Sequence, residues 1–117
     1  MDWREEYRNK LVTAEEAVKV VKSDDRVAFT GLSIGPKVLP QALVNRAGEL
    51  SNVEVLMCGP HADFGWLEPG RKGAFTVTLE TFVGAALRPM KDENRADFTP
   101  VLFSLRFKAE DERPPEA

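Results

Sequence analysis

Apolar and polar residues along the chain follow spacings that predict helices and strands in turn. Near the N-terminus, Trp3, Tyr7 and Leu11 are four residues apart, which places all three on one face of a helix. A second helix is expected after Thr13, because the Thr-x-x-Glu pattern that ends at Glu16 is typical of a capping box. The apolar stripe of this second helix comprises Ala14, Ala17, Val18 and Val21.

The remainder of the chain divides into short apolar segments separated by helical patterns and loops. Buried strands are predicted at residues 26–30, 53–58, 74–79 and 100–105. Helices are expected over residues 39–50, where Pro36 and Pro40 lie near the start, and over residues 82–90. Because helices separate the strands, the sequence predicts an α/β fold with a mostly parallel sheet and flanking helices.

One long segment shows neither the helical nor the strand spacing of apolar residues. Residues 61–73 are rich in Gly, Pro, Asp and aromatic side chains, which is typical of a loop. A long irregular segment within a small domain is often functional or mobile. The function of the protein should therefore be sought here and in the other loops that follow the strands, where ligands bind in open α/β sheets.

Composition describes an ordinary folded protein of one domain. The 117 residues are 43% hydrophobic and 30% charged. We expect the domain to span residues 1–107 and residues 108–117, which are charged and contain prolines, to form a disordered tail. The net charge of −3 argues against nucleic-acid binding.

Several further classes are disfavoured by residue usage. The longest apolar runs are too short to span a membrane, and the polar N-terminus resembles no secretory signal. A single cysteine, Cys58, allows no internal disulfide and fits a reducing cytoplasm. One Cys and one His cannot build a zinc site of the usual kind, so no metal site is expected.

The strongest candidate for a binding site is the turn between the strand at residues 26–30 and the next helix. Gly31 and Gly35 allow close approach of a ligand to the backbone, and amides before a helix favour anionic groups such as a phosphate, a carboxylate or an oxyanion. Ser33 and Pro36 belong to the same turn. The glycine spacing matches neither a P-loop nor a dinucleotide fingerprint, and a turn that needs glycine for geometry alone is the alternative.

Other chemically active side chains carry weaker signals. His61 follows the strand that ends in Cys58 and is the only histidine, so it could act as a base only if a carboxylate such as Asp63 orients it. The ordinary alternative is a structural or exposed histidine. We expect Cys58 to be a core residue and both Glu68 and Glu80 to be solvated or capping groups.

Blocks of sequence along the chain resemble the acetyl-CoA hydrolase/transferase family, which includes 4-hydroxybutyrate and acetate CoA-transferases. The similar blocks are residues 2–7, 10–17, 25–27, 31–36, 39–43, 46–47, 82–84, 88 and 94–104. The resemblance implies a CoA-transferase-like partial domain from a two-domain α/β enzyme, usually oligomeric. It also implies acyl-CoA and carboxylate as substrates, with coenzyme A as a substrate and no further cofactor.

The resemblance also implies what this chain lacks. The family forms a glutamyl-CoA thioester on a glutamate that lies far beyond residue 117, so no catalytic residue is assigned here. The substrate-binding residues expected in this chain are Gly31, Ser33, Gly35, Pro36 and His61. The sequence thus suggests one half of a split, cytoplasmic CoA-transferase with a second subunit. The alternative is a non-catalytic module that binds acyl-CoA or a carboxylate, or serves assembly.

Overall fold

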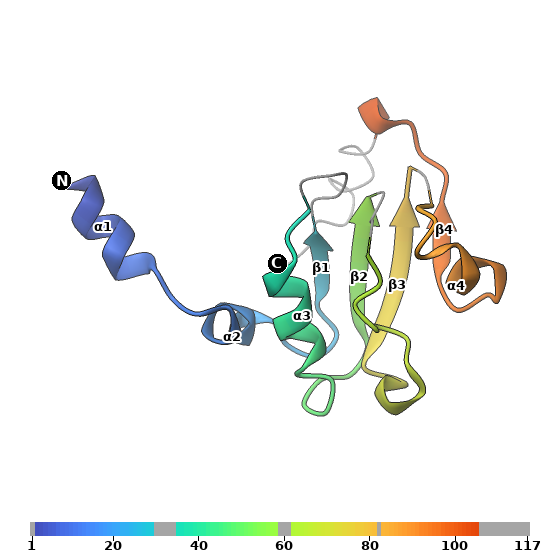
Figure 1. The fold of residues 1–117 in the computed structure, drawn as a ribbon, viewed down its shortest axis with the longest axis horizontal. Helices are drawn as coiled ribbons and strands as arrows, with labels where there is room; N and C mark the ends of the chain where they lie inside the picture. Colours follow the sequence, from blue (N-terminus) through green and yellow to red (C-terminus); the bar gives the residue numbers. More distant parts are fainter. Residues whose placement is uncertain (1, 30–34, 59–61, 82, 106–117) are drawn as a thin grey trace.

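A four-stranded sheet forms the centre of the computed structural model, which describes residues 2–29, 35–58, 62–81 and 83–105 (Figure 1). The strand order is β1-β2-β3-β4, and all three neighbouring pairs are parallel. The strands are β1 (Arg26–Phe29), β2 (Val53–Cys58), β3 (Phe75–Glu80) and β4 (Asp97–Thr99). The prediction of an α/β fold with a mostly parallel sheet and flanking helices is confirmed.

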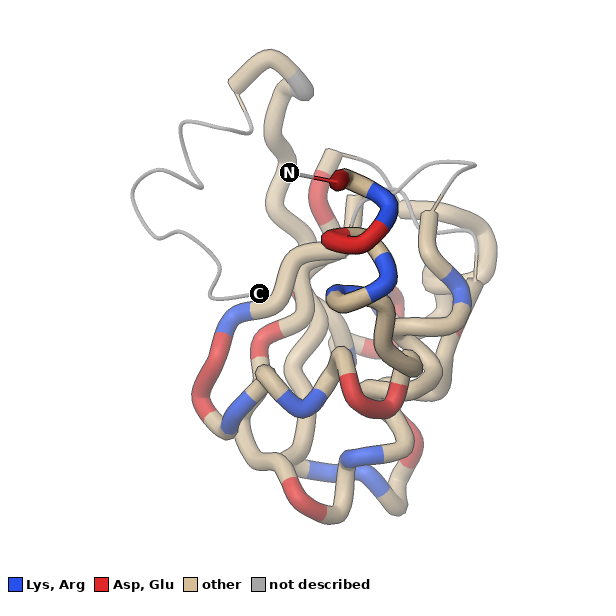
Figure 2. The backbone as a smooth tube through the Cα atoms, turned by 90° about the vertical axis from the view of Figure 1, so that its left-hand side faces the viewer, with Lys and Arg blue, Asp and Glu red and all other residues tan. Residues whose placement is uncertain are grey.

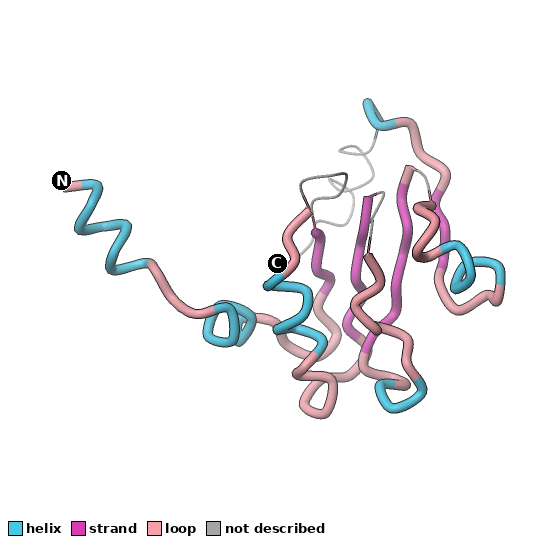
Figure 3. The backbone as a smooth tube through the Cα atoms, in the orientation of Figure 1, coloured by secondary structure: helices cyan, strands magenta, loops and turns pink. Residues whose placement is uncertain are grey.

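Short helices precede and connect the strands (Figure 3). They are α1 (Trp3–Lys10), α2 (Ala14–Ala17), α3 (Val38–Val44) and α4 (Arg88–Asp92), with single 3-10 turns η1 (Val18–Val20), η3 (Pro69–Arg71) and η4 (Phe103–Leu105). The hydroxyl of Thr13 accepts the backbone N–H of Glu16 at 3.2 Å, as the capping pattern predicts. The helix is shorter than its apolar stripe suggests, because it tightens into η1 after one turn.

One face of the sheet carries the main core. Alternate side chains of the strands point toward this face and are buried: Val27, Phe29, Val53, Val55, Met57, Phe75, Val77 and Leu79. Val18 and Val21 from the η1 region and Leu43 from α3 belong to the same buried cluster. The guanidinium of Arg46 donates to the carbonyls of Val18 and Val21, which fixes the end of η1 against the turn after α3.

The described part of the β2–β3 connection, residues 62–74, contains no α-helix and packs onto the same face. Trp66 is fully buried, and its ring lies 6.0 Å from that of Phe29 and 5.1 Å from that of Phe75. The sequence predicts a loop over residues 61–73; in its described part, this loop is anchored by Trp66 and contains η3. In this connection, the side chain of Trp66 therefore packs on the sheet in the way that a crossover helix does elsewhere.

The opposite face of the sheet is also buried at several positions. Leu56, Cys58 and Glu80 have exposed fractions of 0%, 2% and 4%. They alternate with the core residues along β2 and β3, so they point to the other side. At the start of the sheet on this face, Arg26 and Glu54 form an ion pair at 3.2 Å.

The N-terminal helix α1 lies apart from the rest of the chain in Figure 1. None of its residues is buried, and its predicted apolar face is exposed: Trp3 is 67% exposed and Tyr7 60%. The helix carries an Asp2 cap whose carboxylate accepts the N–H of Arg4 at 3.0 Å. The apolar spacing predicted the helix correctly but not its partner.

The prediction of a strand over residues 100–105 is wrong. The fourth strand is Asp97–Thr99, and Phe103–Leu105 forms a 3-10 turn. The pairing with β3 stops at Glu80, which is opposite Thr99, because Thr81 turns away with a φ of 70°. Pro100 follows and has no N–H to continue a ladder.

The boundaries of two predicted helices also differ. The helix expected over residues 82–90 is α4 at Arg88–Asp92, because Pro89 lies in the first turn, where proline starts a helix rather than ends it. The helix expected over residues 39–50 ends at Val44. After it, the N–H groups of Arg46 and Ala47 bond three residues back instead of four, which tightens the chain into turns. The predicted tail at residues 108–117 lies outside the described residues.

Candidate functional site

The carboxyl ends of β1, β2 and β3 lie next to one another at one end of the sheet. Phe29 ends β1 and is opposite Met57, and Cys58 ends β2 and is opposite Glu80 at the end of β3. In an open parallel sheet, ligands bind just outside the carboxyl ends of the strands, because the loops that follow the strands converge there. The candidate site is therefore built from the loops after Phe29, Cys58 and Glu80.

Two of the five predicted substrate-binding residues lie within the described chain. Gly35 and Pro36 are half-buried and lead from the end of β1 into α3. Pro36 lines an apolar groove together with Phe29 and Leu39. Gly31, Ser33 and His61 lie outside the described residues, so their role stays a prediction from the sequence.

A second group of side chains lies at this end of the sheet, and the sequence analysis did not predict it as a site. Glu80 is 4% exposed, so the expectation that it is solvated is wrong, whereas a capping role stays a prediction. The thiol of Cys58 is 3.4 Å from the hydroxyl of Thr81. Cys58, Glu80 and Thr81 thus place a thiol, a carboxylate and a hydroxyl at the ends of two adjacent strands.

A signal for this group was present in the sequence. In β3, Phe75, Val77 and Leu79 alternate with polar residues, which puts Glu80 on the face opposite the main core. Parallel sheets are usually buried on both faces, so a polar residue on the second face need not be solvated. By contrast, Glu68 is exposed and pairs with Arg71 at 3.0 Å, as expected for a surface acid.

The backbone at Thr81 is strained. Its φ of 70° falls in the left-handed region, which a β-branched residue rarely adopts. Such strain costs about 1–3 kcal/mol and is retained only where the surrounding structure requires it. The strain turns the chain out of β3 at the point where the candidate site begins.

The described residues were compared with the requirements of a metal site and of a membrane span. Among them, no group of three or more Cys, His, Asp or Glu side chains could hold a metal ion. The Cys58–Thr81 contact joins a thiol to a hydroxyl, next to the buried carboxylate of Glu80. In the same part of the chain, no helix is long and apolar enough to cross a membrane.

Comparison with known sequences identifies the family of proteins to which this fold belongs. The Acetyl-CoA hydrolase/transferase N-terminal domain matches residues 1–107. The chain therefore belongs to the acetyl-CoA hydrolase/transferase family, and the resemblance inferred from the sequence is confirmed.

Two characterised relatives narrow the comparison. The chain is 32% identical over 103 residues to 4-hydroxybutyrate coenzyme A transferase of Clostridium kluyveri, an alignment that covers 88% of this chain and 24% of the relative. It is 46% identical over 55 residues to butyryl-CoA:acetate CoA-transferase of Anaerostipes caccae, covering 47% of this chain and 12% of that protein. The chain thus spans at most about a quarter of the length of these relatives.

Solved structures share the fold. RipA from Yersinia pestis superposes with a TM-score of 0.71 at 24% identity, over 91% of this chain and 27% of RipA. A single-residue variant of RipA gives a TM-score of 0.75 at 25% identity, over 92% of this chain and 27% of the variant. The sheet and its helices are therefore one part of a larger CoA-transferase-like fold.

Proposed function

We propose that this chain is the N-terminal portion of a split acyl-CoA:carboxylate CoA-transferase, and that a partner polypeptide supplies the catalytic glutamate and most of the CoA site. One observation carries the proposal: the family match runs through residue 107, yet the chain corresponds to only 24% of the 4-hydroxybutyrate CoA-transferase. The remaining three quarters of such an enzyme lie outside this sequence, and the proposal assigns them to a partner polypeptide. We also propose that the assembly is oligomeric and cytoplasmic, with coenzyme A as a substrate and no further cofactor.

The expected reaction needs one nucleophile that this chain does not provide. A glutamate carboxylate of the partner attacks the acyl-CoA carbonyl, and the thiolate of CoA leaves from the tetrahedral intermediate to give a mixed anhydride. The thiolate then attacks the glutamyl carbonyl of the anhydride, which releases the first carboxylate and leaves a glutamyl-CoA thioester. A second carboxylate attacks that thioester and takes up CoA by the same two steps in reverse.

The role proposed for this chain is to form one wall of the substrate pocket. Gly31, Ser33, Gly35 and Pro36 follow β1, and His61 follows β2. Loops at the carboxyl ends of these strands can direct backbone amides toward a carboxylate or toward the oxyanion of the tetrahedral intermediate. Glycine in such a turn allows a substrate to approach the backbone closely.

Reconstitution tests the proposal. The chain is assayed alone and mixed with the polypeptide that carries the remaining family sequence, with acetyl-CoA as donor and 4-hydroxybutyrate or butyrate as acceptor. We expect no transfer by the chain alone and restored transfer by the mixture. A Gly35→Val variant should lower kcat/KM of the mixture, whereas Gly48→Val, at a position where an added Cβ meets no atom within 4 Å, should not.

Two outcomes would overturn the split-enzyme proposal. A covalent CoA adduct on a glutamate of the lone chain, detected by mass spectrometry after incubation with acetyl-CoA, would show that the nucleophile is present here. An inactive mixture together with tight binding of CoA by the lone chain would instead favour the non-catalytic binding module.

A further inference from the structure

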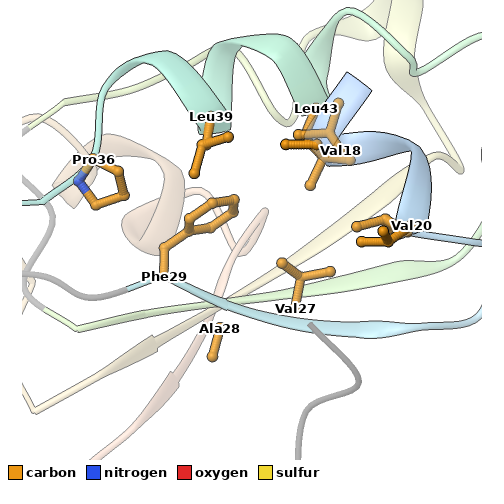
Figure 4. A pocket seen from close by; sticks show the side chains of 10 residues that line it. Val18, Val20, Val27, Ala28, Phe29, Pro36, Leu39 and Leu43 are labelled. Atoms are coloured by element: carbon orange, nitrogen blue, oxygen red, sulfur yellow. The ribbon is translucent and has the colours of Figure 1, made fainter. Parts of the chain in front are cut away.

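The helix α3 presents different side chains on its two sides. Figure 4 shows Leu39 and Leu43 on the side of α3 that faces β1, where they line the apolar groove beside Phe29. Lys37, Gln41 and Asn45 are four residues apart and therefore share one face of the helix. That face lies about 200° around the helix axis from the two leucines, because each residue turns an α-helix by about 100°. The polar face of α3 is thus directed away from the groove.

A pocket of about 440 Å³ lies along this polar face. Its polar groups come from Glu15 of α2 and from Lys37, Gln41 and Asn45. Its apolar part includes the ring of Phe64, which belongs to the β2–β3 connection. The pocket and the groove at β1 have no described lining residue in common. A pocket of this size, with a few polar groups beside an apolar wall, is typical of a small-molecule site.

The two charged residues of the pocket differ from their neighbours in how their charges are matched. Glu16, next to Glu15 on α2, pairs with Lys19 at 2.5 Å. Neither Glu15 nor Lys37 forms an ion pair with any described residue, although both line the same pocket. Their charged groups are therefore not in contact with each other. A ligand that carries an ammonium and a carboxylate can bridge the space between them.

The side-chain amides of the pocket add a donor and an acceptor. The Nε2 of Gln41 donates to the Oδ1 of Asn45 at 3.3 Å. Within the described chain, this bond leaves the carbonyl oxygen of Gln41 and the NH₂ group of Asn45 available to a ligand. An ammonium can donate to that carbonyl, and a carboxylate can accept from that NH₂ group. The amides thus favour the same kind of ligand as the two charges.

The surroundings do not favour a ligand of one charge sign. In Figure 2, which views the molecule from the side that carries α1, acidic and basic positions are interspersed along the backbone. A purely anionic ligand would leave the charge of Glu15 unmatched, and a purely cationic ligand would leave that of Lys37 unmatched. A zwitterion matches both, and Phe64 offers apolar contact to a side chain.

We propose that the pocket between α2, α3 and the β2–β3 connection binds a free α-amino acid with an apolar side chain. The carboxylate of the amino acid pairs with Lys37, its ammonium pairs with Glu15, and its side chain packs on Phe64. The inference goes beyond the proposed function and does not depend on it, since every group it uses belongs to this chain. Lys37 directly follows Pro36, so the amino acid binds beside the predicted substrate-binding turn.

Titration of the purified, ¹⁵N-labelled chain with L-leucine, followed by NMR, tests the site. We expect saturable shifts of the backbone amide signals of Val38, Gln41 and Phe64. The Kd should be on the order of 1 mM, because Glu15 and Lys37 are exposed and exposed ion pairs contribute little. N-acetyl-L-leucine lacks the ammonium and L-leucinamide lacks the carboxylate, so each should bind about fivefold more weakly than L-leucine.

Two charge variants and a matched control connect the ligand groups to the residues. Glu15→Gln and Lys37→Gln should each weaken the binding of L-leucine about fivefold. Glu15→Gln should not change the affinity for N-acetyl-L-leucine, which has no ammonium, and Lys37→Gln should not change that for L-leucinamide. Lys19→Gln is the control, since Lys19 is exposed, follows α2 and does not line the pocket. Circular dichroism establishes that each variant is folded.

Each other outcome overturns the proposal in a different way. The absence of saturable shifts at millimolar L-leucine shows that the pocket binds no such amino acid. Equal binding of N-acetyl-L-leucine and L-leucine assigns the pocket to anions, and equal binding of L-leucinamide assigns it to cations. Binding of L-leucine that neither charge variant weakens places the amino acid elsewhere on the chain. An inactive reconstituted mixture, by contrast, overturns the split enzyme and leaves the result of these titrations unchanged.

Discussion

Gly65 shows at the scale of one residue why the β2–β3 connection has a fixed shape. Its φ is 76°, its N–H donates to the carboxylate of Asp63 at 2.7 Å, and its carbonyl accepts from the guanidinium of Arg71 at 2.7 Å. A Cβ at this position would collide with the side chains of Arg71 and Glu68. The turn that delivers Trp66 to the core thus requires glycine for its backbone angle and for space.

Replacing Gly65 should destabilise the chain. We expect Gly65→Ala to lower the free energy of unfolding by about 1–3 kcal/mol, because alanine must adopt a left-handed conformation and displace an ion pair. Gly48→Ala is the control, since no atom lies within 4 Å of its added Cβ. Urea denaturation followed by circular dichroism measures both. Equal stability of the two variants would show that the turn does not have this conformation.

At the scale of elements, the sequence predicted what repeats and missed what depends on distant partners. The apolar run at residues 53–58 and the alternation at residues 74–79 predicted both central strands, which the structure has at Val53–Cys58 and Phe75–Glu80, because a buried strand shows its pattern locally. The last strand was misplaced because apolar residues after Pro100 looked more strand-like than Asp97–Thr99, which pairs only through its register with β3. The alternation along β3 places Glu80 on the second face of the sheet, but whether that face is covered depends on distant parts of the chain, which no local pattern gives.

The helix α1 and the β2–β3 connection each carry one of the two tryptophans and can be compared directly. Trp3 is 67% exposed on α1, whereas Trp66 is fully buried against Phe29 and Phe75. We expect acrylamide to quench the emission of Trp3, observed in a Trp66→Phe variant, several-fold more than that of Trp66, observed in a Trp3→Phe variant. Trp66→Phe should remain folded, because the indole N–H that it removes has no hydrogen-bond partner among the described residues. Similar quenching of both would show that α1 packs on the chain.

On the scale of the whole molecule, the sheet is covered unequally. The turn η1, the helices α3 and α4 and the β2–β3 connection contribute to a core on one face, while the other face presents Leu56, Cys58 and Glu80 from the two central strands. These positions are nevertheless buried, so reaching them from solvent requires the sheet or its covering to open. Their accessibility therefore reports on the integrity of the whole fold rather than on one loop.

Cys58, the single cysteine, makes this accessibility measurable. It is 2% exposed at the end of β2, and β2 pairs with a strand on each side. We expect a thiol reagent to label Cys58 about a hundredfold or more slowly than an engineered thiol in Val38→Cys on a Cys58→Ser background, because labelling requires an opening that costs a few kcal/mol. Labelling of both thiols at the same rate would show that the second face is open in the lone chain. The burial of Leu56 and Glu80 on that face would then not persist in solution.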